Sequence, residues 1–239
     1  MNVMKQFWML LLGLACCDSG KGSATSIPSQ AGPITVYAAS SLTDAVGEVA
    51  REWTRRKHQG VKPQFEASST LARQIQEGAP ADLFLSAAPE WIDRVKPLER
   101  FDWVSNRLVV VVRKDAKEFD LGSIGSLALA NEQVPVGKYA KAALAHLQIT
   151  LPERIIYGSS VRDVLSKVSQ GGASAGIVYA TDAPMDAELR IAYTFPPESH
   201  PRIVYSAGLV RPEGKALFEA LREPWVLDIL HRYGFVDLN

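Results

Sequence analysis

Cysteine is almost absent from this sequence. Cys16 and Cys17 stand side by side near the N-terminus, and no cysteine follows them. A folded part without cysteine can form no disulfide, can use no thiolate as a nucleophile and can bind no metal through sulfur. Thiol-based catalysis and cysteine-ligated metal sites are therefore excluded for the chain after Cys17.

An excess of charge of either sign is also missing. The sequence holds 26 lysines and arginines against 26 aspartates and glutamates. Without a global positive field, the protein has no long-range attraction for nucleic acid or for an anionic membrane surface. We therefore expect no nucleic-acid partner, and any selectivity for an anion has to come from local groups.

Long apolar runs are missing as well, apart from one near the N-terminus. Residues 7–15 form an apolar segment that is too short to span a bilayer, and Lys5 precedes it. This pattern is typical of an export signal, so we predict a leader over residues 1–17 and a periplasmic or otherwise extracytoplasmic protein. Residues 18–32 are rich in serine and glycine and are predicted to form a flexible tether.

The leader ends in L-A-C-C, which is similar to a bacterial lipoprotein signal. Such a signal implies that a cysteine is acylated and anchors the protein to the membrane. Ala15 is a suitable residue before Cys16, whereas Cys17 has Leu14 three positions before it, so the two cysteines remain alternatives. A plain secretory signal with a chance pair of cysteines is the other interpretation of this segment.

The stretch around which the chain is organised is residues 34–44, which read I-T-V-Y-A-A-S-S-L-T-D. A strand-forming run leads through two small alanines into Ser40 and Ser41, and a helical pattern starts at Leu42. Ser41 and Asp44 have capping-box spacing, which predicts a helix start at the carboxyl end of the strand. Ligands bind at that end of an open parallel sheet, where free N–H groups and the helix dipole favour an anion.

Strands alternate with amphipathic helices along the rest of the chain, which predicts parallel sheets with helices on both faces. Residues 107–113 form a continuous apolar run, predicted to be a strand buried on both faces that crosses into a second lobe. Residues 203–210 are predicted to cross back. The sequence thus predicts an α/β protein of two lobes, each a mostly parallel sheet flanked by helices: residues 33–106 with 207–239, and residues 107–206.

Four segments of small or hydroxyl-bearing residues stand directly before predicted helices. A single serine in such a place is normally only a helix cap worth about 1 kcal/mol. Four segments, two from each predicted lobe, favour a shared anion site in the cleft, because each offers neutral donors and the positive end of a helix dipole. The segments contain Ser40 with Ser41, Ser68 with Ser69, Val136 with Gly137, and residues 159–161.

These segments belong to a set of motifs that resembles the molybdate-binding proteins of bacterial ABC importers, which are type II periplasmic binding proteins. The motifs run from Tyr37 to Ala183 and read Y-A-A-S-S-L-T-D-A, S-S-T-L-A-R-Q-I, G-A-P-A-D-L-F-L-S-A, V-P-V-G-K-Y-A, S-V-R-D-V and G-I-V-Y-A-T-D-A. The resemblance covers essentially everything after the tether. It implies a two-lobed periplasmic binding protein type II fold that captures molybdate or tungstate between its lobes.

The resemblance also implies that the tetrahedral oxyanion is held by neutral donors only. The implied donors are the hydroxyls and amides of Ser41 and Ser68, the amides of Val136 and Val161, and the phenol of Tyr179, with Ser40, Ser69 and Ser160 as neighbours. Ser68 and Ser69 remain alternatives, because the run of hydroxyl residues can slide by one register. Alanine is common in the family where this chain has Val136, a difference that bears on crowding more than on the backbone donor.

The same resemblance implies a solute-binding component that delivers its ligand to an inner-membrane ABC permease. It implies no cofactor and no metal other than the molybdenum or tungsten of the ligand, and we expect a monomer that touches the membrane only through a lipid anchor. Molybdate, tungstate and sulfate are dianions that only accept hydrogen bonds, so an all-donor site suits them. Sulfate or another tetrahedral oxyanion is the alternative ligand.

Charged residues near the motifs have simpler interpretations. Arg162 follows a predicted cap, and we expect it to be solvated or to lie behind the donors rather than to bind the anion. Asp44 and Asp163 are most simply capping carboxylates in the first turns of their helices. We therefore predict that no carboxylate touches the ligand.

Two other functional classes, serine hydrolases and ligand-sensing regulators, share single features with this sequence. Residues 172–176, G-A-S-A-G, fit the G-x-S-x-G pattern of serine hydrolases, but that motif needs a strand before the serine and a helix after it, and the predicted order here is reversed. A ligand-sensing regulator domain shares the architecture but would need a DNA-binding segment, where this chain has an export signal. The sequence therefore predicts a binding protein and no enzyme.

Overall fold

The computed structural model describes residues 32–116 and 118–238. The predicted leader (residues 1–17), both cysteines and all but the last residue of the predicted tether lie outside the described residues. Within the described ranges, no helix is both long and apolar enough to cross a membrane.

The first sheet contains five strands in the order β2-β1-β3-β10-β4. The central strand β1 runs parallel to both β2 and β3, whereas β10 is antiparallel to β3 and to β4. Pro63 predicts an edge strand and lies in the edge strand β2, because a proline there leaves no ladder bond unmade. The bounds are β1 (Ile34–Ala39), β2 (Val61–Glu66), β3 (Leu83–Ser86), β4 (Glu99–Ser105) and β10 (Val204–Leu209).

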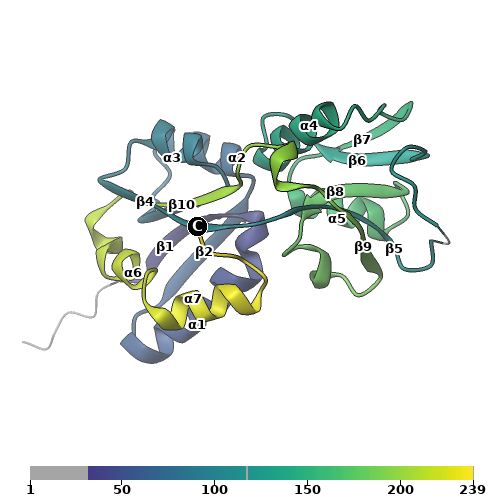
Figure 1. The fold of residues 1–239 in the computed structure, drawn as a ribbon. Helices are drawn as coiled ribbons and strands as arrows, with labels where there is room; N and C mark the ends of the chain where they lie inside the picture. The colour runs from purple at the N-terminus through teal and green to yellow at the C-terminus, as the bar shows by residue number, and fades with distance from the viewer. Residues whose placement is uncertain (1–31, 117, 239) are drawn as a thin grey trace, which may run out of the picture. The chain divides into compact units, whose positions relative to one another are not determined.

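Helices cover both faces of this sheet (Figure 1), and alternate residues of β1 show how. Tyr37 packs in one apolar cluster with Leu71 of α2, while its neighbour Val36 packs in another with Val49 of α1. Such alternation follows from the two-residue repeat of a strand. The helices of this lobe are α1 (Thr43–Lys57), α2 (Ser68–Gln76), α3 (Pro89–Val95), α6 (Lys215–Ala220) and α7 (Pro224–Arg232), with short 3₁₀ turns η1 (Ser40–Leu42) and η4 (Pro212–Gly214).

The second sheet has the strand order β7-β6-β8-β5-β9. Here β6 runs parallel to β7 and β8, and β5 is antiparallel to β8 and β9. All but the last residue of β5 are buried, which confirms the predicted burial of the apolar run. The elements are β5 (Leu108–Arg113), β6 (Ser126–Ala130), β7 (Arg154–Gly158), β8 (Ala175–Tyr179), β9 (Leu189–Thr194), α4 (Pro135–His146), α5 (Val161–Ser169), η2 (Ala183–Met185) and η3 (Pro197–Ser199).

The chain passes twice between the sheets, but the two predicted crossing strands do not themselves cross. Strand β5 forms its ladders within the second sheet and β10 within the first, so the crossings are the residues between β4 and β5 and those between β9 and β10. The predicted return to the first lobe at residue 207 falls inside β10. Each sheet is parallel in the part built by β–α–β units and antiparallel where a strand follows one of these short crossings.

The two lobes touch through residues at the starts of their helices. Lys138 of α4 pairs with Glu90 of α3 at 2.6 Å, and Arg162 of α5 donates to Asp44 of α1 at 2.5 Å. These contacts bring the carboxyl ends of the parallel strands in one lobe close to those in the other. The ligand cleft expected from the topology is therefore a narrow space between helix starts.

Candidate functional site

A small cavity lies between the lobes and has a volume of about 10 Å³. Pockets for drug-sized ligands are larger, roughly 300–1,000 Å³, so this one suits a ligand of a few atoms. None of its lining residues, all of them described by the structure, carries a charge. They are Ala39, Ser40, Ser41, Ala67, Ser68, Ala87, Val134, Pro135, Val136, Val161 and Tyr179.

The five residues proposed as donors all line this cavity. Their neighbour Ser40 lines it too, whereas Ser69 and Ser160 do not. Of the two alternatives that the sequence left open, Ser68 lines the cavity and Ser69 does not.

Four helix starts form most of the cavity wall. The turn η1 follows β1, α2 follows β2, α4 follows β6 and α5 follows β7. The N–H groups of Ser68, Val136 and Val161 lie in the first turns of α2, α4 and α5, where the helix itself supplies no acceptor. Together they present backbone donors and helix-dipole ends to one small space, which favours an anion.

The predicted capping box of Ser41 and Asp44 is wrong. The 3₁₀ turn η1 intervenes after β1, so the N-cap of α1 is Leu42 and no side chain caps it. Ser41 Oγ lies 2.8 Å from Tyr205 Oη instead. Because the helix starts beyond it, the Ser41 hydroxyl is left to face the cavity.

The corresponding prediction for Ser160 and Asp163 is confirmed. Asp163 N donates to Ser160 Oγ at 3.2 Å, and Asp163 Oδ2 accepts from Ser159 N at 2.8 Å. Ser160 is the N-cap of α5, with its side chain used by the cap. What faces the cavity from this helix is therefore the residue after the cap, Val161.

Ala87 is a lining residue that the sequence analysis missed. It follows β3, and its N–H donates to Ser68 Oγ at 3.0 Å. The available signal was the pair of small residues Ala87 and Ala88 directly after a buried strand, which is similar to the pair Ala38 and Ala39 at the end of β1. This bond occupies a lone pair of Ser68 Oγ and leaves its hydrogen free.

Tyr179 ends β8 and is only 1% exposed. Among the described residues, its hydroxyl has no hydrogen-bond partner, although buried hydroxyls usually have one. Burial raises the pKa of Tyr179 well above its ordinary value, so the phenol keeps its proton. Its ring packs edge-on against Tyr139 and Tyr205, at centroid distances of 6.4 and 5.8 Å. The result is a fixed O–H group in the cavity wall without an internal acceptor.

The sequence pattern predicts a helix over residues 138–148, but helix α4 begins three residues earlier, at Pro135. Proline is favoured at the first position of a helix, and that signal was overlooked. Gly137 allows the early start, since a Cβ there would meet the carbonyl oxygens of Ala130 and Asn131 at 2.3 Å. This close approach brings Val136 to the cavity.

Arg162 follows Val161 but does not line the cavity. Its guanidinium donates to Asp44 Oδ2 at 2.5 Å, and its Nε lies 2.6 Å from Asp182 Oδ1, close enough for an ion pair but not aligned as a hydrogen bond. Burial raises the pKa of Asp182 to about 6, and Arg162 opposes that rise. The expectation that Arg162 lies behind the donors fits this geometry, whereas Asp44 makes an interlobe ion pair in place of the predicted cap.

The serine of the hydrolase-like motif is engaged elsewhere. Ser174 precedes β8, and its Oγ donates to Ser126 O at 2.7 Å and accepts from Ser126 N at 2.9 Å. A helix ends before it and a strand follows, as the sequence predicted. The strand–serine–helix turn that a hydrolase needs is therefore not formed here.

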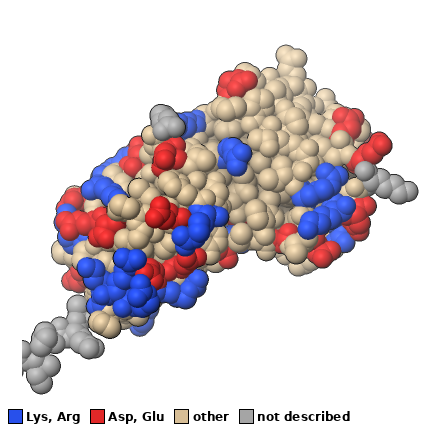
Figure 2. Space-filling model, turned by 60° about the horizontal axis from the view of Figure 1, so that its bottom comes forward, with Lys and Arg blue, Asp and Glu red and all other residues tan. Residues whose placement is uncertain are grey.

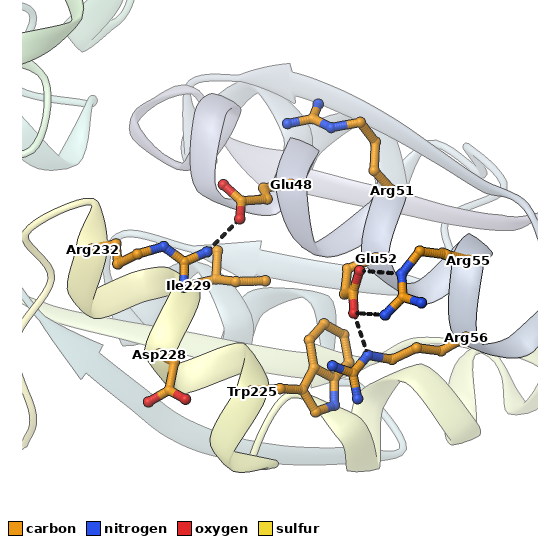
Figure 3. A pocket seen from close by; sticks show the side chains of 9 residues that line it. All are labelled: Glu48, Arg51, Glu52, Arg55, Arg56, Trp225, Asp228, Ile229 and Arg232. Carbon is orange, nitrogen blue, oxygen red and sulfur yellow. Dashed lines mark hydrogen bonds and ion pairs between the residues drawn. The ribbon is translucent and has the colours of Figure 1, made fainter.

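A larger hollow between α1 and α7 has a volume of about 490 Å³ and carries the guanidinium groups that the cavity lacks (Figure 3). Arg55 and Arg56 both bind Glu52, and Arg56 also lies 4.6 Å from the centre of the Trp225 ring. Figure 2 likewise shows lysine and arginine mixed with aspartate and glutamate over the displayed face. Arg55 and Arg56 in this hollow are thus already paired with a carboxylate. The hollow is therefore a less favourable binding site for a small dianion than the cavity.

Similar proteins are solute-binding proteins. The family described as bacterial extracellular solute-binding protein matches residues 34–236. The molybdate-binding protein ModA of Escherichia coli strain K12 is 36% identical, over 97% of this chain and 99% of that protein. The putative ABC transporter substrate-binding lipoprotein YvgL of Bacillus subtilis strain 168 is 31% identical, over 93% of this chain and 92% of that protein.

The fold has a solved counterpart. The periplasmic molybdate-binding protein of Azotobacter vinelandii superposes with a TM-score of 0.77, over 86% of this chain and 100% of that one. At 21% sequence identity the likeness concerns the fold, and it confirms the predicted two-lobed fold class.

Proposed function

This chain belongs to the bacterial extracellular solute-binding proteins, and we propose that it captures molybdate or tungstate in the cavity between its lobes, as the extracytoplasmic component of an ABC importer. The names of its relatives in Escherichia coli and Bacillus subtilis support both the ligand and the transporter. The protein then acts by binding and handing over an ion, without catalysis.

The observation that carries the proposal is the uncharged, donor-lined cavity. A hydrogen bond to a charged acceptor contributes roughly 1.5–3 kcal/mol, and each helix dipole adds roughly 0.3–1 kcal/mol for a negative ligand. Ser41, Ser68 and Tyr179 offer hydroxyl donors, and the first turns of α2, α4 and α5 offer N–H groups. Several such groups together offset the desolvation of a small dianion without a cationic side chain.

The donor set also restricts the protonation state of the ligand. Molybdate, tungstate and sulfate carry no proton, so each of their oxygens can accept. Protonated phosphate needs an acceptor for its own hydrogen, and no carboxylate lines the cavity. Molybdate is then distinguished from sulfate by size, because the donors are equivalent for both; sulfate is the alternative ligand.

The partner of the loaded protein is an inner-membrane permease. The monomer is tethered through residues 18–32 and, where the leader is a lipoprotein signal, through an acylated Cys16 or Cys17. Because both lobes contribute donors to one anion, the ligand binds the closed arrangement of the lobes more tightly than an open one. Binding therefore shifts the population toward the closed arrangement.

Titration calorimetry on the purified protein tests the proposal. Competition among molybdate, tungstate, sulfate and phosphate should rank the first two as tightest and phosphate as weakest. Ser41→Ala and Tyr179→Phe should each weaken molybdate binding about 10- to 100-fold, since each removes one bond to a charged acceptor. Ser69→Ala is the matched control, because Ser69 neighbours Ser68 without lining the cavity. Unchanged affinity in both site variants would refute the site.

A further inference from the structure

A chain of hydrogen bonds runs behind the cavity from Asn106 through Tyr205 to Ser41. Asn106 Nδ2 donates to Tyr205 Oη at 3.3 Å and to Thr181 Oγ1 at 2.9 Å. Tyr205 Oη in turn lies 2.8 Å from Ser41 Oγ. Asn106 stands in the short crossing between β4 and β5, and it joins Thr181 of the second lobe to Tyr205 of the first.

The orientation of the Asn106 amide is fixed by a backbone group. Arg107 N lies 2.8 Å from Asn106 Oδ1, and a backbone N–H can only donate. The oxygen of the amide must therefore face Arg107, which turns the NH₂ group toward Tyr205. Tyr205 Oη consequently accepts from Asn106 and has its own hydrogen to place.

Ser41 Oγ is the acceptor for the hydroxyl hydrogen of Tyr205. Tyr205 is fully buried, and a buried hydroxyl hydrogen without an acceptor is costly. Of the described residues, only Asn106 and Ser41 hydrogen-bond to Tyr205 Oη, and Asn106 presents its donor. The phenol therefore donates to Ser41 Oγ, which leaves the hydrogen of Ser41 for the cavity.

The hydroxyl of Ser68 is oriented in the same way by a different donor. Its Oγ accepts from Ala87 N, so its hydrogen too is free to turn to the cavity. In both serines a protein donor fills a lone pair of the hydroxyl oxygen. Each hydroxyl is thereby biased to donate to a ligand and not to accept from one.

We propose that Tyr205, held by Asn106, is a positioning residue that keeps Ser41 a hydrogen-bond donor and so sets the discrimination between fully deprotonated and protonated oxyanions. This inference deepens the proposed function and rests on it. The absence of a carboxylate alone does not exclude a protonated ligand, because a freely rotating serine hydroxyl can also accept. The relay occupies one of the two lone pairs of Ser41 Oγ and turns its hydrogen toward the cavity, so it makes acceptance from a ligand less favourable at Ser41. It requires no contact between Tyr205 and the ligand.

Tyr205→Phe tests the relay, because it removes one oxygen and preserves the ring. Molybdate and sulfate affinities should each fall about three- to tenfold, as for loss of one hydrogen bond. The affinity for inorganic phosphate, measured by its displacement of molybdate near neutral pH, should stay constant or rise. The ratio of molybdate to phosphate affinity should therefore narrow by at least about three- to tenfold. Asn106→Ala frees the phenol to accept from Ser41 and should narrow the ratio in the same direction.

Two comparisons separate positioning from a merely structural role. Tyr233→Phe loses a phenol bond to Glu48, and neither residue lines the cavity, so this variant should leave the ratio unchanged. In the double variant Ser41→Ala/Tyr205→Phe, the effect of Tyr205→Phe should disappear, because the hydroxyl on which it acts is gone.

The outcomes distinguish this inference from the function on which it rests. An equal loss of molybdate and phosphate affinity in Tyr205→Phe, no change in either, or a full Tyr205 effect in the Ser41→Ala background would overturn the relay while leaving the site in place. A wild-type protein that fails to bind molybdate would overturn both.

Discussion

The cavity between the lobes and the hollow between α1 and α7 differ in the charge of the residues that line them. The hollow is lined by Arg51, Arg55, Arg56 and Arg232, yet Glu48, Glu52 and Asp228 line it as well. The residues that line the cavity carry no formal charge, but their hydroxyls and the helix N-termini supply hydrogen-bond donors to one space. Formal positive charge is therefore a poor guide to an anion site in this protein, because nearby carboxylates satisfy it.

Burial explains why the uncharged cavity is the better binding site for an anion. An exposed ion pair is screened by water and salt, so it adds little. In the cavity wall, Ser41 and Tyr179 are almost fully buried, and donors there act in a medium of low dielectric constant. Fixed dipoles in such a place need no reorganisation when the anion arrives.

The largest effect is expected from breaking the neutrality of the cavity. Ser68→Asp places a carboxylate beside the ligand and removes a donor, while Ala87 N can still donate to the new side chain. Two unit charges about 4 Å apart interact by roughly 4 kcal/mol at an effective dielectric constant near 20, and molybdate carries two charges. Molybdate affinity should fall by more than about a thousandfold in titration calorimetry.

Ser68→Asn is the control for that experiment, since it has nearly the same size and no charge. Thermal unfolding should show that both variants fold. If the aspartate and asparagine variants bound molybdate equally, charge would not govern this cavity.

The sequence predicted the secondary structure around the site well because its signals are local. The run A-G-I-V-Y predicts a strand over residues 175–179, which is β8, and Pro89 predicts a helix start, which is the first residue of α3. The strand β4 was missed, because its E-R-F-D-W-V-S run mixes charged with apolar residues and half of it is exposed. Pairing partners were the harder part, since whether β5 and β10 cross or stay in one sheet depends on contacts distant in sequence.

Five lining residues could be predicted because small or hydroxyl-bearing residues before helices combine with a specific set of motifs, whereas Ala87 was missed. The five are Ser41, Ser68, Val136, Val161 and Tyr179. Tyr205 and Asn106 could not be predicted, since an aromatic residue in a strand and an asparagine between strands have no distinctive pattern. Their importance comes from a contact between residues 164 positions apart in the chain. The failed capping box at Ser41 has a similar cause, because a 3₁₀ turn moves the N-cap from Ser41 to Leu42 and the helix start to Thr43.

An intermediate effect is expected for the buried ion pair beside the cavity. The folded pKa of Asp182 is about 6, above the ordinary 3.8, because burial disfavours its charge. A raised carboxyl pKa means that the folded state binds the proton more tightly, so this contribution to stability is complete below pH 3.8 and is lost as the pH rises through about 6. Arg162 reduces the loss by pairing with the charged form.

Asp182→Asn removes this titration and sharpens the contrast with the exposed pairs of the hollow. The unfolding free energy of the wild type minus that of the variant should decrease between pH 4 and pH 7.5, by an amount on the order of 1–3 kcal/mol. Urea unfolding at several pH values measures it. A difference that is flat across this range, or that increases, would contradict a buried carboxyl with a raised pKa.

The smallest effect is expected from removing cations in the hollow. Arg55→Ala with Arg56→Ala deletes both partners of Glu52, which are exposed and lie at the far end of α1 from the cavity. Since salt screens exposed charges beyond about 8 Å at physiological ionic strength, molybdate affinity should stay within about twofold of the wild type. Calorimetry at low and at physiological salt checks this. A loss above about tenfold that disappears at high salt would mean that the arginine field, and not the local donors alone, draws the anion to the protein.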